Sequence, residues 1–117
     1  MIMGIGTRRG VTEPEVLDAV AAALSEAGIQ PENIELLASS TLKENEAGLL
    51  SAAKTLGKEI RFLPDDVINK YEPESESEAS RFGLKGVAEP AALALSKCRQ
   101  LVFKKKVYGR VTIAIAK

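Results

Sequence analysis

The sequence contains no histidine and no tryptophan, and it has one cysteine, Cys98. Without histidine, the chain lacks both the commonest general base and the commonest metal ligand of proteins. A single cysteine permits neither an internal disulfide nor a thiolate metal cluster, and a lone free thiol is typical of a reducing compartment. These absences exclude cysteine–histidine hydrolases and His/Cys metal centres, so we expect no metal site and no cofactor held by the protein.

Net charge and long apolar runs are also lacking. The 16 Lys and Arg residues balance the 16 Asp and Glu residues, and aromatic residues make up only 4% of the chain. A neutral surface with few aromatic rings argues against nucleic-acid binding. No apolar run approaches the roughly 20 residues of a bilayer-spanning helix, and the first residues do not resemble a signal peptide. We therefore expect a cytoplasmic protein without nucleic-acid or membrane partners.

Helical patterns are recognisable from their ends. Thr12 and Glu15 have the spacing of a capping box, and Gly28 ends the helical periodicity that follows. A second amphipathic helix is expected around 49–56, closed by Gly57. Because 117 residues with 45% hydrophobic content suit one globular domain, we interpret residues 1–117 as a single domain.

Short apolar runs predict strands at 1–6, 34–41 and 59–63, which alternate with these helices. Strands linked through helices are usually parallel, whereas the closing strand pair is expected to be antiparallel. The order of elements predicts an α/β protein, a three-layer α/β/α sandwich with a mixed, mostly parallel sheet of about five strands.

The second half of the chain is less regular. The acidic stretch 72–81 carries almost no large apolar side chains and is expected to be a mobile loop. Glu89 lies at the start of a further predicted helix. The closing strands are expected at 101–103 and 107–116, joined by a hairpin turn at Lys104–Lys106.

A glycine-rich loop between the first strand and the first helix is the first candidate site. Its Gly4–Gly10 segment is no dinucleotide-binding fingerprint, because Arg9 occupies the position of the third glycine. Glycine backbone and two neighbouring guanidiniums, Arg8 and Arg9, are instead suited to a carboxylate or other anion. The alternative, that both arginines are solvated loop charges, is equally favoured by the sequence.

Three further segments are candidates, each with a plainer alternative. Segment 43–48 follows the second strand and so is expected at the same sheet edge as the arginine loop, where its Glu46 could simply cap a helix. Glu89 could be a general acid or base, or it could complement a helix dipole. The lysines Lys104–Lys106 could bind an anion, or they could be a solvated turn.

These segments resemble a known family when they are taken together and in order. Gly4–Thr12, Lys43–Leu49, Val87–Ala92, the lysine-rich segment and Val111–Ala116 are similar to the C-terminal domain of the cobalamin-biosynthesis protein CbiG and to its stand-alone relative CobE. The resemblance covers essentially the whole chain. It implies a role in corrin-ring biosynthesis, in which CbiG-type proteins open the lactone of cobalt-precorrin-5A and release a two-carbon aldehyde.

The resemblance also implies roles for the candidate residues. A carboxylate-rich macrocycle that carries its own cobalt would meet cationic and glycine-loop residues, and Glu46 or Glu89 would activate water. The expected substrate-binding residues are Gly6, Thr7, Arg8, Arg9, Gly10, Lys43, Lys104, Lys105 and Lys106. A separate CbiG N-terminal-type protein is an expected partner, and the oligomeric state is open. Two alternatives remain: a non-catalytic tetrapyrrole carrier and, more remotely, a nucleotide-phosphate binder.

Overall fold

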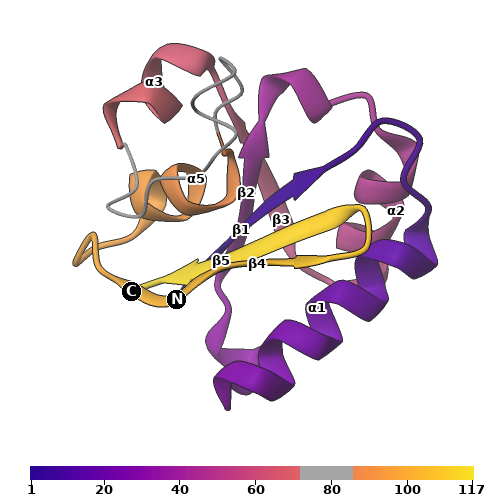
Figure 1. Ribbon diagram of the computed structural model, residues 1–117, viewed down its shortest axis with the longest axis horizontal. Coiled ribbons are helices and arrows are strands. Elements are labelled where there is room, and N and C mark those ends of the chain that lie inside the picture. The colour runs from indigo at the N-terminus through magenta and orange to yellow at the C-terminus, as the bar shows by residue number, and fades with distance from the viewer. Residues whose placement is uncertain (72–85) are drawn as a thin grey trace.

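A mixed sheet forms the centre of the molecule (Figure 1). The computed structural model describes residues 1–71 and 86–117, so the predicted mobile loop at 72–81 lies outside the described residues. The described part contains a five-stranded sheet in the order β3-β2-β1-β5-β4. Its strands are β1 (Ile2–Thr7), β2 (Leu36–Ser40), β3 (Glu59–Leu63), β4 (Leu101–Tyr108) and β5 (Val111–Ala116). β1, β2 and β3 are parallel, whereas β5 is antiparallel to both of its neighbours, which confirms the predicted mixed sheet.

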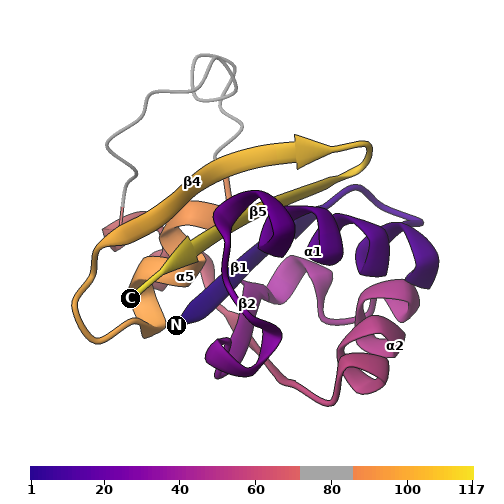
Figure 2. The same ribbon diagram turned by 90° about the horizontal axis from the view of Figure 1, so that it is seen from below.

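Helices cover both faces of this sheet, so the predicted three-layer α/β/α arrangement is confirmed (Figure 2). One face carries α1 (Glu13–Ala27) and α2 (Ala47–Leu56), and the other carries α5 (Ala88–Leu95) with the short α3 (Asp65–Lys70) beside it. A 3₁₀ turn at Pro31–Asn33 precedes β2 and another at Thr41–Lys43 follows it. The strand itself covers only Leu36–Ser40 of the predicted 34–41. Within the described ranges, no helix combines the length and apolar character needed to cross a membrane.

The first helix begins as its sequence predicts. The backbone N–H of Glu15 donates to Thr12 Oγ1 at 3.4 Å, and the Thr12 N–H donates to Glu15 Oε1 at 3.1 Å, which completes the capping box. Gly28 ends the helix in the left-handed conformation. The buried face of α1 packs on the sheet through Val16, Ala19, Val20, Ala23 and Leu24.

On the opposite face, α5 packs unusually close to β1. A Cβ added at Gly4 would lie 1.8 Å from the carbonyl oxygen of Ala88, so only glycine permits this approach. The residues Ala88–Ala92 are all buried. Gly4, the first glycine of the Gly4–Gly10 segment, therefore has a packing role, and the close contact holds the start of α5 against β1.

The predicted turn at Lys104–Lys106 is wrong, because these lysines lie inside β4. The chain reverses instead at Gly109 and Arg110, between Tyr108 and Val111. A run of three charged residues is compatible with an edge strand, whose alternate side chains reach opposite faces. Register shifts between Leu101 and Phe103 and between Phe103 and Lys106 accompany this segment.

Candidate functional site

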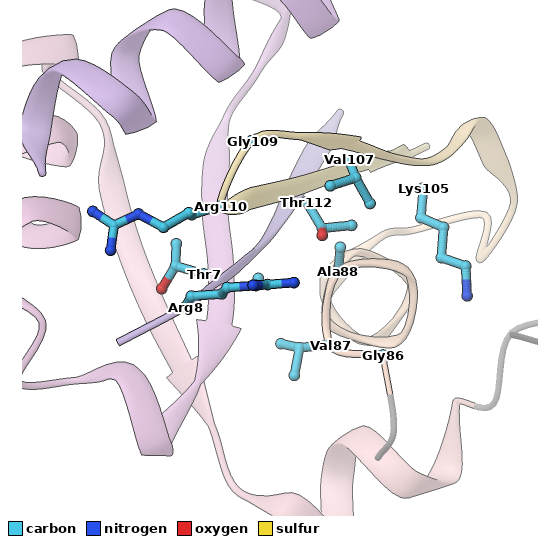
Figure 3. Close-up of a pocket in the computed structure, with 11 residues that line it drawn as sticks. Thr7, Arg8, Gly86, Val87, Ala88, Lys105, Val107, Gly109, Arg110 and Thr112 are labelled. Carbon is cyan, nitrogen blue, oxygen red and sulfur yellow. The ribbon is translucent and has the colours of Figure 1, made fainter. Parts of the chain in front are cut away.

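A cavity of about 250 Å³ lies where β1 ends and α5 begins (Figure 3). The antiparallel pairing of β1 with β5 brings the β4–β5 turn to the same place, since Thr7 is paired with Val111. Ligands of open α/β sheets commonly bind at this carboxyl edge of the parallel strands. The cavity is lined by Gly6, Thr7, Arg8, Gly86, Val87, Ala88, Lys105, Val107, Gly109, Arg110 and Thr112.

The walls of the cavity combine apolar surface with positive charge. Val87, Ala88 and Val107 form apolar surface, and the Val107 residue is 65% exposed, although most valines in proteins are buried. Arg8 and Lys105 border the same space from a loop and from β4. An apolar wall beside cationic side chains suits an organic ligand that bears carboxylates.

The two cations flank the start of α5. Figure 3 shows the Arg8 side chain extending toward Ala88. A Cβ added at Gly86 would lie 3.9 Å from Lys105 Nζ, so this ammonium group lies beside the chain that enters the helix. Among the described residues, no side chain caps the α5 N-terminus, whose residue Val87 lines the cavity. The helix dipole and the two side chains therefore each favour an anion at the start of α5.

Glu89 does not line the cavity, but it contacts a residue that does. The Glu89 residue is 1% exposed, and its Oε2 accepts a hydrogen bond from the backbone N–H of Lys105 at 3.2 Å. Lys105 lies within the register shift between Phe103 and Lys106. Because a register shift disturbs the ladder of backbone hydrogen bonds, the buried carboxylate provides an acceptor for a strand amide that needs one.

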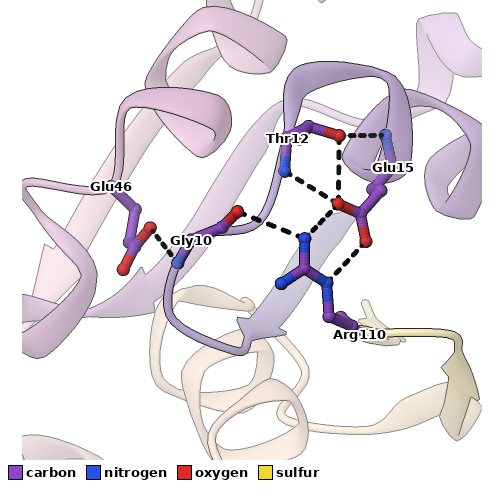
Figure 4. A network of polar contacts seen from close by, with 5 residues as sticks. All are labelled: Gly10, Thr12, Glu15, Glu46 and Arg110. Atoms are coloured by element: carbon purple, nitrogen blue, oxygen red, sulfur yellow. Dashed lines mark hydrogen bonds and ion pairs between the residues drawn. The ribbon is translucent and has the colours of Figure 1, made fainter.

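Arg110 is a charged residue of the cavity lining that the sequence interpretation missed. Its Nε donates to Glu15 Oε2 at 2.8 Å, and its Nη2 donates to Glu15 Oε1 and, at 3.2 Å, to the carbonyl of Gly10 (Figure 4). The hydrogen bond from Arg110 lowers the pKa of Glu15 to about 2. In turn, Glu15 raises the pKa of Arg110. The β4–β5 turn is thereby tied to the N-terminus of α1.

The two predicted site loops meet at the same edge of the sheet. Glu46 Oε2 accepts a hydrogen bond from the backbone N–H of Gly10 at 3.1 Å, which joins segment 43–48 to loop 6–11 (Figure 4). Glu46 is the residue that precedes α2, but its side chain makes no capping hydrogen bond to that helix. The carboxylate instead holds the arginine loop.

The predicted site residues divide into two groups. Four of the predicted substrate-binding residues line the cavity: Gly6, Thr7, Arg8 and Lys105. The other predicted binding residues and both predicted bases lie outside its lining: Arg9, Gly10, Lys43, Lys104, Lys106, Glu46 and Glu89. Lys106 points away from it, since its Nζ pairs with Glu26 of α1 at 2.5 Å. Among residues 1–71 and 86–117, no three His, Cys, Asp or Glu side chains form a group that could hold a metal ion.

Comparison with known proteins gives consistent matches. A family model described as "Cobalamin synthesis G C-terminus" matches residues 1–116. A cobalt-precorrin-5A hydrolase of Priestia megaterium is 30% identical over an alignment of 118 positions, which covers 99% of this chain and 32% of that protein. Protein CobE of a Sinorhizobium species is 29% identical over 99% of this chain and 79% of its own length.

Solved structures agree with the sequence comparison. The crystal structure of CobE, a protein from the cobalamin (vitamin B12) biosynthetic pathway, superposes with a TM-score of 0.83 at 34% identity. The superposition covers 97% of this chain and 86% of the CobE chain. The chain thus spans most of CobE, but only about a third of the matched Priestia hydrolase.

Proposed function

We propose that this chain, which belongs to the cobalamin synthesis G C-terminal family, binds a cobalt-precorrin at the cavity between β1 and α5. The observation that carries the proposal is the cavity itself, in which apolar Val87 and Val107 lie near cationic Arg8 and Lys105. A cobalt-precorrin is a macrocycle with carboxylate arms, and it carries its own cobalt as part of the substrate. Its apolar ring edge and its carboxylates match the two kinds of wall.

The size of the cavity indicates how such a ligand would bind. Its volume of about 250 Å³ is below the range of about 300–1,000 Å³ for pockets that enclose drug-sized ligands. A four-ring macrocycle is larger than such ligands. We expect one ring edge and its carboxylate arm to enter, with the arm directed toward Arg8 and the start of α5.

The reaction in which this binding takes part is lactone opening and aldehyde release from cobalt-precorrin-5A. Glu46 and Glu89 were the candidate bases, yet each is hydrogen bonded to a backbone amide and neither lines the cavity. This arrangement favours substrate binding as the contribution of the chain. The matched hydrolase is about three times longer than this chain. We propose that a separate protein of the CbiG N-terminal type corresponds to the rest of that hydrolase and supplies groups for the hydrolytic step.

An aldehyde-release assay with cobalt-precorrin-5A tests the division of roles. We expect the chain alone to bind the corrinoid, observed by its visible absorbance, and to release aldehyde only when an N-terminal-type partner is added. Release by the chain alone would instead identify it as a complete hydrolase. Binding without release in either case would favour the carrier alternative, and absence of binding would contradict both proposals.

A matched ligand control tests what is recognised. The same corrinoid with its carboxylates converted to methyl esters keeps the macrocycle and the cobalt but loses the negative charges. If Arg8 and Lys105 recognise carboxylates, the ester should bind much more weakly than the acid, and Arg8→Ala should reduce only the binding of the acid. Equal binding of acid and ester would contradict carboxylate recognition.

A further inference from the structure

The loop that carries Arg8 is held at Gly10, where side chains bind both the backbone N–H and the backbone carbonyl. The Gly10 N–H donates to Glu46 Oε2 at 3.1 Å, and the Gly10 carbonyl accepts from Arg110 Nη2 at 3.2 Å (Figure 4). Backbone contacts continue this pattern, because the Arg8 N–H donates to the Arg110 carbonyl at 3.0 Å. Glu46 precedes α2 and Arg110 lies in the β4–β5 turn, so two distant parts of the chain fix one exposed loop.

The Arg110 side chain is itself held in place. Glu15 binds its guanidinium through two nitrogen atoms, and the same carboxylate accepts from the Thr12 N–H at 3.1 Å. The contacts therefore run from the N-terminus of α1, through Glu15 and Arg110, to the Gly10 carbonyl. A planar guanidinium can engage both a carboxylate and a carbonyl in fixed directions, whereas the single ammonium group of lysine cannot reproduce this fork.

The charged groups of Arg8 and Arg110 point in opposite directions. In Figure 3 the Arg8 side chain extends toward Ala88, whereas the Arg110 guanidinium extends away from α5. Arg110 borders the cavity, but its guanidinium is bound to Glu15 and Gly10. We propose that Arg110 is a positioning residue, which fixes the Gly10 carbonyl and thereby presents Arg8 to a carboxylate of the ligand. This inference rests on the function proposed above.

A double-mutant cycle distinguishes positioning from direct contact. Binding of cobalt-precorrin-5A is titrated by visible absorbance for the wild type, Arg8→Ala, Arg110→Ala and the double variant. We expect Arg8→Ala to weaken binding about tenfold or more, as for a lost charge-assisted contact. Arg110→Ala should weaken it roughly five- to tenfold, and the double variant should bind no more weakly than Arg8→Ala alone. Additive losses would mean that Arg110 acts independently of Arg8, which would overturn the proposal.

Conservative variants separate geometry from charge. Arg110→Lys keeps the positive charge but loses the fork, so we expect it to bind the ligand nearly as weakly as Arg110→Ala. Glu15→Gln keeps the capping box, because glutamine also serves at this position, but weakens the hold on Arg110. It should reduce binding in the same direction and by a smaller factor. Full binding by Arg110→Lys would contradict the geometric role.

A measurement without ligand keeps the inference separable from the proposed function. Amide hydrogen exchange of residues 8–11 should be faster in Arg110→Ala than in the wild type. The control is Arg61→Ala in β3, which removes an exposed arginine paired with Glu59 at 2.7 Å and should leave this loop unchanged. If the wild type fails to bind the corrinoid, the proposed function is contradicted and the role of Arg110 in presenting Arg8 falls with it. If the wild type binds and exchange is unchanged in Arg110→Ala, the positioning role alone is overturned.

Discussion

Substitution of Gly4 by alanine tests the contact that forms one wall of the site. The added Cβ would lie 1.8 Å from Ala88 O, 2.8 Å from Ala88 C and 3.0 Å from the backbone nitrogen of Ala92. All three atoms belong to the backbone of α5, so no side-chain rotation can relieve the overlap. Real Cβ atoms essentially never approach closer than 3.0 Å, and the helix would have to retreat from β1 by more than 1 Å.

The expected loss follows from what α5 buries. Residues Ala88–Ala92 are all buried, and a retreat of the helix would loosen each of them. Overpacking a core typically lowers the free energy of unfolding by about 1–3 kcal/mol, occasionally more. Because the overlap here is with backbone atoms that cannot rotate away, we expect a value at the upper end of this range. We predict that Gly4→Ala lowers the free energy of unfolding by about 3 kcal/mol, a large share of the 5–15 kcal/mol of a typical domain.

Gly6→Ala is the matched control for this prediction. Gly6 lies two residues along the same strand, where an added Cβ would meet its nearest neighbour, Val87 Cβ, at an ordinary 3.7 Å. Urea unfolding followed by circular dichroism should show a loss within about 1 kcal/mol for Gly6→Ala. Equal stabilities of the Gly4 and Gly6 variants would refute the close packing of α5 on β1.

Three further predictions concern single side chains. Lys105→Ala should weaken binding of cobalt-precorrin-5A severalfold, whereas Lys106→Ala should leave binding unchanged, because Lys105 lines the cavity and Lys106 pairs with Glu26. Equal effects of the two variants in a binding titration would contradict the role of Lys105. The hydrogen bond from Arg110 lowers the pKa of Glu15 from 4.5 to about 2, so the stabilisation by this carboxylate is complete above pH 4.5 and is lost as the pH falls toward 2. Acid unfolding should therefore show a smaller decline in stability for Glu15→Gln than for the wild type. Ser39→Ala should lower the free energy of unfolding by about 1 kcal/mol, since the buried Ser39 hydroxyl donates to the Ile5 carbonyl at 2.7 Å. An unchanged midpoint of urea unfolding would contradict this prediction.

The elements that were predicted well are those with local signals. The capping box of Thr12 and Glu15 acts over three residues, and Gly28 and Gly57 end their helices through their own backbone conformation. The strand at 59–63 is confirmed to the residue. The alternation of strands and helices along the chain was sufficient to predict the three-layer arrangement, because short connections between elements allow few other topologies.

The closing strands show why local charge misled the prediction. Three consecutive lysines resemble a solvated turn, but Lys105 and Lys106 alternate between the cavity and Glu26 of α1. The turn signal in the sequence was Gly109, a single glycine between two strand-like runs, and the structure shows it with a positive φ. Because the lysine run was taken as the turn in place of Gly109, the hairpin turn was predicted several residues too early.

The details of the site depend on contacts between distant parts of the chain. Arg110 and Glu15 are 95 residues apart in sequence, and Glu46 and Gly10 are 36 apart. The sequence was sufficient to expect both loops at one sheet edge, since each follows a parallel strand. It contained no signal that Glu46 and Glu89 would each accept a hydrogen bond from a backbone amide.

Mapping of the bound corrinoid by two-dimensional NMR tests the central claim most directly. With a diamagnetic cobalt-precorrin added to the labelled chain, the largest amide shifts should fall at residues 6–8, 86–88 and 105–107, which surround the cavity. The same shifts should be strongly reduced in Arg8→Ala. Shifts centred instead on the opposite edge of the parallel strands, near Lys58 and Glu59, or no shifts at all, would contradict a cobalt-precorrin site between β1 and α5.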